Sequence, residues 1–142
     1  PILVVRADDQ NVGIPMLSVE SVAGATASHL VVGASETRLK HEDELLPVVD
    51  LAAVLGLRPP RTVAGGRLLI IHSQGRRVAA WVDDVVADMD LAIRPLPPEV
   101  AHLPLYQGAS SLAGGELLLI MRPDWLAARP EAQRPFGGRP NG

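Results

Sequence analysis

The sequence predicts an all-β fold in which one small barrel unit occurs twice and the helices are short. Two observations carry this prediction. Short aliphatic runs alternate with polar turns along the chain, as in "LVVRADDQNVGI", and this alternation is typical of strands joined by tight hairpins. The same order of runs and turns returns in the second half of the chain. We therefore expect the two halves to build similar units.

The repeat has a regular spacing. Residues 3–22 match residues 69–88 at an offset of 66, and residues 43–55 match residues 115–127 at an offset of 72. Such self-similarity indicates a duplicated unit. We place the first barrel at residues 1–62, the second at 63–126 and a disordered tail at 127–142, and the two barrels can exchange a strand. The aliphatic pairs that coincide are Leu3 with Leu69, Val4 with Ile70, Val5 with Ile71, Val12 with Val78 and Val19 with Val85.

Within each unit the expected elements follow in order. The polar turn "DDQN" separates two strands, and Ser18 is placed to cap a single helical turn in "SVESV". Asp83 takes the same place before "DDVV" in the second copy. Pro47 lies in the strand after the charged turn "KHEDE", so that strand must meet the proline at an edge, an end or a bulge. Gly56 is placed to stop a short helix in "AAVLGL".

Two segments favour irregular structure. Residues 91–115 contain four prolines, which cannot occupy central strands, so this segment is expected to cross the surface between the barrels. The end of the chain, "AARPEAQRPFGGRPNG", is rich in Arg, Pro and Gly and has little to bury. We expect it to be disordered. The prolines of the first segment are Pro95, Pro97, Pro98 and Pro104.

Composition excludes several classes of function. The net charge is -3 with no basic stripe, so the electrostatic footprint of nucleic-acid binding is missing. The chain contains no cysteine, which excludes thiol redox chemistry and thiolate metal sites. No apolar run approaches the ~20 residues of a membrane helix. With four aromatic residues among 142, the chain also lacks the aromatic groove that proline-rich ligands need. Because the chain begins at Pro1, we expect a piece of a longer polypeptide.

No catalytic or cofactor-binding pattern stands out. The four histidines, His29, His41, His72 and His102, fall in separate elements without the paired spacing of a metal site. His41 precedes Glu42 and Asp43, but three polar residues at a hairpin tip are typical of a solvated turn. The glycine pairs lack the lysine of a phosphate-binding loop. We therefore expect a noncatalytic domain without cofactor or metal, and a duplicated barrel that binds a small ligand is a remote alternative.

The stretch "LPVVDLAAVLGL" resembles the hallmark of the CheW-like domain family of bacterial chemotaxis. The second half is similar to the family in "GRRVAAWVDDVV", in the proline-containing loop "AIRPLPPEVAHLPLYQGASSL" and in "GGELLLIMRPDWL". The long loop and the segment "SETRLKHEDELLPVVDL" resemble the C-terminal regulatory domain of CheA-type histidine kinases more than free-standing CheW. The free-standing adaptor remains the alternative.

The resemblance implies two intertwined SH3-like five-stranded barrels that act as a scaffold. The expected partners are a CheW-type adaptor, the cytoplasmic tip of a chemoreceptor and the other kinase domains in cis. The expected location is the cytoplasm, at chemoreceptor arrays. The family commonly carries an arginine-glycine pair at the hairpin turn, where this chain has Glu42 and Asp43. In a receptor contact, Arg38 or Lys40 would then supply the positive charge.

Mismatches between the two copies predict further partner contacts. Leu17 corresponds to Asp83, and Glu20 corresponds to Val86. A position that is apolar in one copy and charged in the other is expected to lie outside the shared core. The family joins the first barrel of one member to the second barrel of another. We therefore expect Leu17, and separately Val86 with Met89, at the two partner-binding ends.

Overall fold

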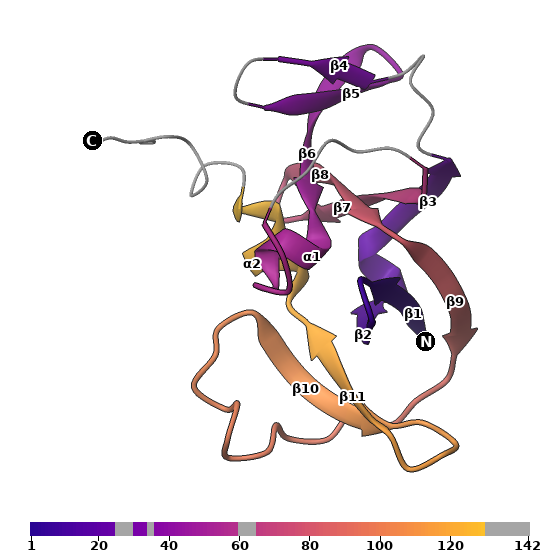
Figure 1. Ribbon diagram of the computed structural model, residues 1–142, viewed down its shortest axis with the longest axis vertical. Coiled ribbons are helices and arrows are strands. Elements are labelled where there is room, and N and C mark those ends of the chain that lie inside the picture. The colour runs from indigo at the N-terminus through magenta and orange to yellow at the C-terminus, as the bar shows by residue number, and fades with distance from the viewer. Residues whose placement is uncertain (25–29, 34–35, 60–64, 130–142) are drawn as a thin grey trace.

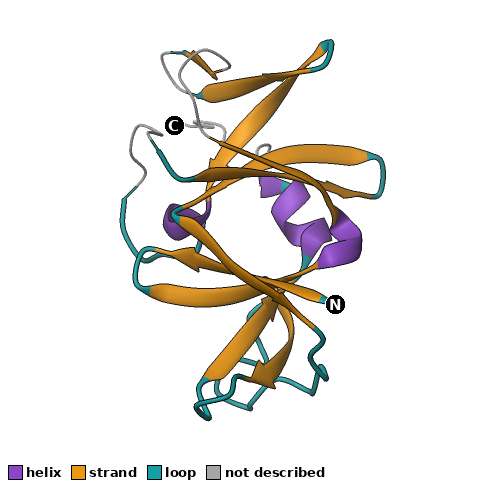
Figure 2. Cartoon of the chain, turned by 90° about the vertical axis from the view of Figure 1, so that its right-hand side faces the viewer, coloured by secondary structure: helices purple, strands orange, loops and turns teal. Residues whose placement is uncertain are grey.

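The computed structural model describes residues 1–24, 30–33, 36–59 and 65–129 (Figure 1). These residues form two curled sheets with short helices at the waist of the molecule (Figure 2). None of the described helices is long and apolar enough to span a bilayer. The elements are β1 (Ile2–Ala7), β2 (Gln10–Pro15), η1 (Met16–Ser18), β3 (Val19–Gly24), β4 (Leu30–Val32), β5 (Thr37–His41), β6 (Glu44–Asp50), α1 (Leu51–Val54), β7 (Arg67–Ser73), β8 (Arg76–Val82), β9 (Asp84–Met89), β10 (Tyr106–Ser111), β11 (Leu117–Met121) and α2 (Pro123–Ala127).

Each sheet combines strands from both halves of the sequence. Sheet A has the order β10-β11-β2-β1-β9, and sheet B has the order β3-β7-β8-β6-β5-β4. The sheets therefore do not follow the two sequence halves. The expected barrel boundaries at residues 1–62 and 63–126 remain a prediction, and the junction between them falls in 60–64, outside the described residues.

The strand pairings confirm the duplication. Val5 pairs with Val85 in sheet A, and the equivalent pair in sheet B is Ile71 with Val19. The parallel contact between β11 and β2 has its counterpart in the parallel contact between β6 and β8. Each equivalent pair joins one strand from each half. The all-β fold with an internal repeat is thus confirmed.

The continuous aliphatic runs of the sequence are strands buried on both faces. In β1, Ile2 and Val4 point into the interior of sheet A, whereas Leu3 and Val5 point into a central core shared by both sheets. The equivalent strand β7 divides its side chains in the same way between the interior of sheet B and the central core. Because successive side chains of a strand point to opposite faces, only an apolar run satisfies both environments.

The prediction of a helical turn in "SVESV" is wrong. The backbone forms the 3-10 turn η1 at Met16–Ser18 and then the strand β3, and neither Ser18 nor another side chain caps the turn. The "DDVV" segment is also a strand, β9, and the Asp83 carboxylate before it accepts a hydrogen bond of 2.5 Å from the backbone N–H of Asp8. Both segments find strand partners, β7 and β1, and this tertiary pairing overrides a weak local preference.

Pro47 lies where β6 changes partners. Up to Pro47 the strand pairs with β5, and from Val48 onward it pairs with β8. Proline has no N–H to donate, and Pro47 lies where the ladder with β5 ends and the ladder with β8 begins. Of the predicted alternatives, an edge, an end or a bulge, the structure therefore shows the end of a ladder. Gly56, with φ of 77°, ends the turn that follows α1, and its N–H donates to the carbonyl of Ala53 at 3.0 Å.

The proline-rich segment carries no strand between β9 and β10, and its single bridge joins Arg94 to Ala109. Its path lies beside β10 at one end of the molecule (Figure 1). The disordered tail was predicted to begin at residue 127, but Ala127 is the last residue of α2 and is buried in the central core, so the predicted boundary is wrong at this residue. The part of the tail at 130–142 lies outside the described residues.

Candidate partner-binding surface

The apolar residues predicted at partner-binding ends divide into two groups. Leu17 stands out from η1 with 86% of its surface exposed, and Val86 is 51% exposed on β9. Met89 instead packs against the interior of sheet A, next to its strand partner Ile2. Residues three apart in a strand point to opposite faces, so Val86 and Met89 of β9 do not share a surface. Of the three predicted apolar residues, Leu17 and Val86 are therefore the exposed ones and Met89 is partly buried.

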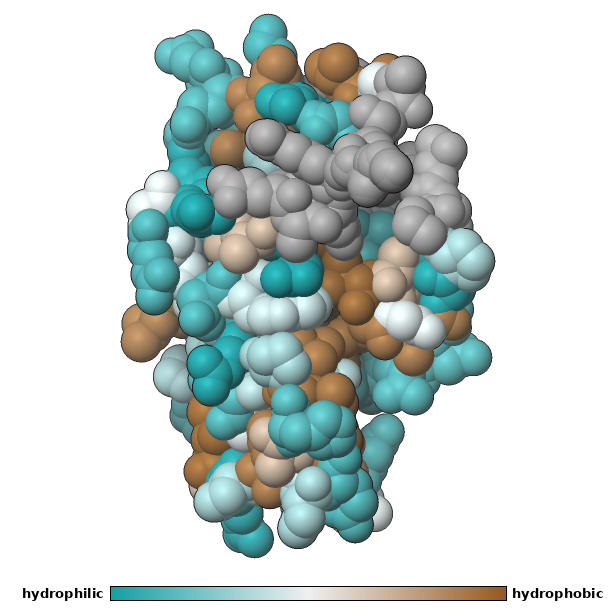
Figure 3. Space-filling model, turned by 90° about the vertical axis from the view of Figure 1, so that its left-hand side faces the viewer, coloured by the Kyte–Doolittle hydropathy of each residue, from teal (hydrophilic) through white to brown (hydrophobic). Residues whose placement is uncertain are grey.

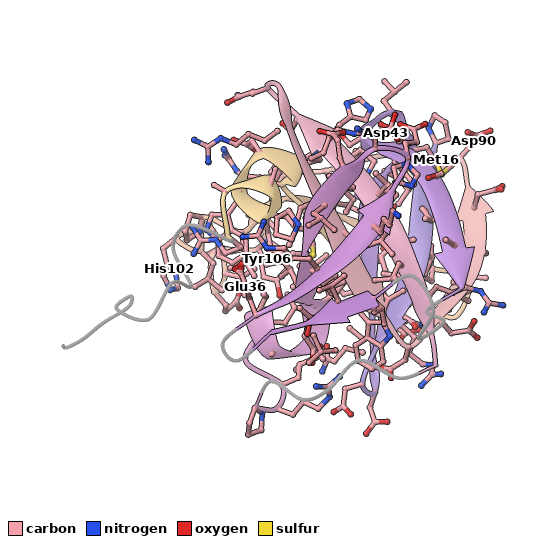
Figure 4. The ribbon with its side chains drawn as sticks, turned by 90° about the horizontal axis from the view of Figure 1, so that it is seen from above. Met16, Glu36, Asp43, Asp90, His102 and Tyr106 are labelled. Carbon is pink, nitrogen blue, oxygen red and sulfur yellow. The ribbon has the colours of Figure 1, made fainter. Side chains whose placement is uncertain are left out.

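The charged residues of the predicted site lie on the β5–β6 hairpin. Arg38 and Lys40 share the face opposite the buried Leu39, and Arg38 forms an ion pair with Glu36 at 2.6 Å. Lys40 is exposed beside Leu45, its partner across the hairpin. In Figure 4, Glu36 and Asp43 mark the two ends of this hairpin. Since Glu36 neutralises Arg38, Lys40 is the more accessible cation of the two.

Glu42 belongs to an ion-pair cluster that the sequence did not reveal. It occupies the hairpin turn with φ of 54°, and its carboxylate lies 3.6 Å from the guanidinium of Arg77 on β8. Arg77 also donates to Glu20 of β3 at 2.5 Å and to Glu44 of β6. His41 lies 3.5 Å from Glu20. We call Glu20, Glu42, Glu44 and Arg77 the sheet B end.

The guanidinium sets the charge state of this cluster. The hydrogen bonds that Arg77 donates to Glu20 lower the pKa of the Glu20 carboxyl, and they raise the pKa of Arg77 in turn. Ligand atoms of Glu20, His41 and Glu42 lie within 4.8 Å of one another, the spacing of a metal site. Arg77 already contacts both carboxylates, and its fixed positive charge opposes a second cation there. The geometry is that of an ion-pair cluster.

The equivalent positions in sheet A carry no such cluster. At the two offsets of the repeat, Asn11 corresponds to Arg77, Val86 to Glu20, Gly114 to Glu42 and Glu116 to Glu44. We call these four residues the sheet A end. The mismatch between Glu20 and Val86 was visible in the sequence, and so was the replacement of Asn11 by Arg77. The sequence did not show that the fold brings β3, β6 and β8 together.

Apolar side chains also reach the surface elsewhere. On the face shown in Figure 3 they appear at the upper end, in the middle and at the lower end of the molecule, between polar side chains. Scattered apolar residues are normal on a surface, so exposure alone assigns no contact. Among the residues that the structure describes, the other exposed large apolar side chains are Val22, Val31, Val32, Leu45, Ile93 and Leu117.

Comparison with known proteins decides the family. The model of the CheW-like domain matches residues 1–131. The chain belongs to the CheW-like domain family. The chemotaxis protein CheA of Rhizobium meliloti (strain 1021) is 25% identical over 134 residues, and the match covers 92% of this chain and 18% of that protein. The CheA protein of Cereibacter sphaeroides is 26% identical over 125 residues, again across 18% of its length.

A solved structure has the same fold. The crystal structure of the scaffolding protein TtCheW from Thermoanaerobacter tengcongensis matches with a TM-score of 0.70 and 18% sequence identity, covering 85% of this chain and 87% of that one. Membership of the CheW-like domain family confirms the family resemblance seen in the sequence. This chain spans about a fifth of the length of the CheA relatives that it matches, so it corresponds to a portion of those proteins.

Proposed function

We propose that this CheW-like domain is a noncatalytic coupling domain of bacterial chemosensory signalling, namely the regulatory domain of a CheA-like histidine kinase. The observation that carries the proposal is the match to CheA proteins over 92% of this chain but 18% of the relative's length. In this role the domain docks a CheW-type adaptor and a chemoreceptor tip and connects to the other kinase domains in cis. Its place is the cytoplasmic side of a receptor array.

The free-standing CheW-type adaptor is the second candidate, because TtCheW is matched over 87% of its chain. The two candidates differ in genetic context. A kinase regulatory domain requires an ATP-binding domain encoded upstream in the same reading frame. An open reading frame limited to the CheW-like domain would instead select the adaptor. Sequencing the flanking region distinguishes them.

The exposed residues Leu17 and Val86 are our proposed contacts with the adaptor. Each is an apolar side chain at a position that is acidic in the other copy of the repeat, and this difference would give the joint between barrels a direction. Lys40, with Arg38 beside it, is the proposed cation for an acidic receptor side chain. Glu42 is the weakest of the proposed partner contacts, because its carboxylate already lies 3.6 Å from the guanidinium of Arg77.

Charge substitutions test the adaptor contacts. We expect Leu17→Asp and Val86→Asp each to weaken binding of a CheW-type adaptor by ~2 kcal/mol in a calorimetric titration, because each would place a charge in a desolvated apolar contact. Since both side chains are exposed, the melting temperature should hardly change. The matched control is Val32→Asp, which alters a valine that is 65% exposed outside the proposed ends. Unchanged affinity in both test variants would refute the proposed contacts.

A further inference from the structure

Arg77 connects parts of sheet B that are not neighbouring strands. In the order β3-β7-β8-β6, strand β7 separates Arg77 on β8 from Glu20 on β3, yet the guanidinium reaches Glu20 across the curled sheet. The same guanidinium bonds Glu44 of β6 and approaches Glu42 in the hairpin turn. One side chain thus links an edge strand to the tip of the β5–β6 hairpin.

The hairpin tip has no apolar anchor of its own. The buried hydrophobic contacts of the hairpin come from Leu39 and Leu46, nearer its base. Beyond them, residues 42–45 are exposed and His41 is half-buried. The contacts that reach the tip from β8 and β3 are those of Arg77 with Glu42 and Glu44 and that of Glu20 with His41.

From this arrangement we propose that Arg77 is a salt-sensitive clasp that fixes the tip of the β5–β6 hairpin against β3 and opens when its charges are screened or neutralised. Exposed ion pairs weaken as salt rises, since the Debye length falls from ~30 Å at 0.01 M to ~3 Å at 1 M. Neutralising Glu20 has the same effect, because Glu20 is the anchor on β3. The charged or titratable groups that face Glu20 are Arg77 from β8, His41 from β5 and Glu42 from the turn.

The equivalent hairpin of sheet A provides an internal control. Its tip is closed by hydrogen bonds between Leu112 and Glu116 and from Gly115 to Leu112, and the position of Arg77 is taken by Asn11. Screening should leave this tip unaffected. A salt response confined to the sheet B hairpin would therefore be the signature of the clasp.

Amide hydrogen exchange by NMR on the full chain tests the clasp. We expect protection at His41 and Glu44 to fall roughly 3- to 10-fold between low and high salt, the range for a small network of exposed ion pairs. Protection at Leu112 and Gly115 should stay constant. Arg77→Gln should lower tip protection at low salt to the wild-type high-salt value and remove the salt response.

Two further variants keep the result interpretable. Lys40→Gln removes one positive charge, as Arg77→Gln does, but Lys40 is not a member of the ion-pair cluster. The salt response of this variant should therefore match that of the wild type. Glu20→Gln breaks the clasp from the β3 side and replaces Arg77→Gln if that variant fails to fold. The clasp is disproved if the salt response persists in the broken variants, or if both hairpin tips respond equally to salt.

Discussion

The sheet A end and the sheet B end are built from equivalent positions of the duplicated unit but carry different side chains. Arg77 binds three carboxylates at the sheet B end, whereas Asn11, Val86 and Gly114 replace most of that charge at the sheet A end. The pairing of β1 with β9 matches that of β7 with β3, so the exchange of Val86 for Glu20 is a side-chain difference on a shared backbone. The hairpin turns differ in backbone as well, because the turn between Leu112 and Glu116 is one residue longer than the turn between His41 and Glu44. A duplicated fold can thus keep one strand order while its two ends carry different charge.

The interiors of the two sheets differ as well. Sheet B places Ala79 and Trp81 on β8, and the equivalent positions on β2 are Gly13 and Pro15. Trp81 is 2% exposed, donates its indole N–H to the carbonyl of Gly65 at 2.7 Å and lies under the guanidinium of Arg58 at 5.3 Å. Sheet A instead brings Ile2 and Ile120 close to the backbone of Gly13.

The largest expected effect comes from emptying the interior of sheet B. Trp81→Ala should lower the free energy of unfolding by about 3–5 kcal/mol, because it removes the largest buried side chain and leaves a cavity. Urea unfolding followed by circular dichroism measures this loss. Trp125→Ala, at a partly buried position beside the central core, is the control and should cost less. A smaller loss for Trp81→Ala than for Trp125→Ala would contradict the proposed role of Trp81.

Filling the interior of sheet A should have an intermediate effect. A Cβ atom at Gly13 would lie 2.6 Å from Ile120 Cδ1 and 2.8 Å from Ile2 Cγ2, so Gly13→Ala should cost about 1–3 kcal/mol through overpacking. Gly114→Ala, where an added Cβ meets open space, is the matched control. If both variants unfold at the same urea concentration, sheet A is not as tightly packed as this comparison requires.

The smallest expected effect is an acid response confined to the sheet B end. Hydrogen bonds from Arg77 lower the pKa of Glu20 in the folded chain. The contribution of Glu20 to stability is therefore present above the ordinary pKa of glutamate and is lost as the pH falls through the lowered folded value. The urea midpoint of the wild type should drop toward that of Glu20→Gln over this acidic range. A constant difference between the two midpoints would refute the coupling.

Sequence reasoning recovered the features that depend on local pattern and on the repeat. The aliphatic runs predicted the strands, the offset of 66 predicted equivalent elements, and Gly56 marked the end of the turn after α1. It failed where tertiary pairing decides the outcome. The four letters "DDVV" fit a helical turn or a strand equally well, and the partner β1 selects the strand. In that strand Met89 is partly buried on the face opposite the exposed Val86.

The Arg77 cluster was beyond sequence reasoning for a related reason. Its members lie on three strands and a turn separated by up to 57 residues, and only the curl of sheet B brings them together. The predicted cations Arg38 and Lys40 were placed correctly on the hairpin. The ion pair between Arg38 and Glu36 depends on the geometry of that hairpin face.

Exchanging the mismatched residues tests the central claim, that the exposed Val86 at the sheet A end contacts the adaptor whereas its counterpart Glu20 at the sheet B end does not. Val86→Glu gives sheet A the residue found in sheet B, and Glu20→Val makes the opposite exchange. Calorimetric titration with a CheW-type adaptor should show affinity roughly 30-fold weaker for Val86→Glu, equivalent to ~2 kcal/mol, and unchanged for Glu20→Val. Unchanged affinity for Val86→Glu, or a loss found with Glu20→Val alone, would contradict the account.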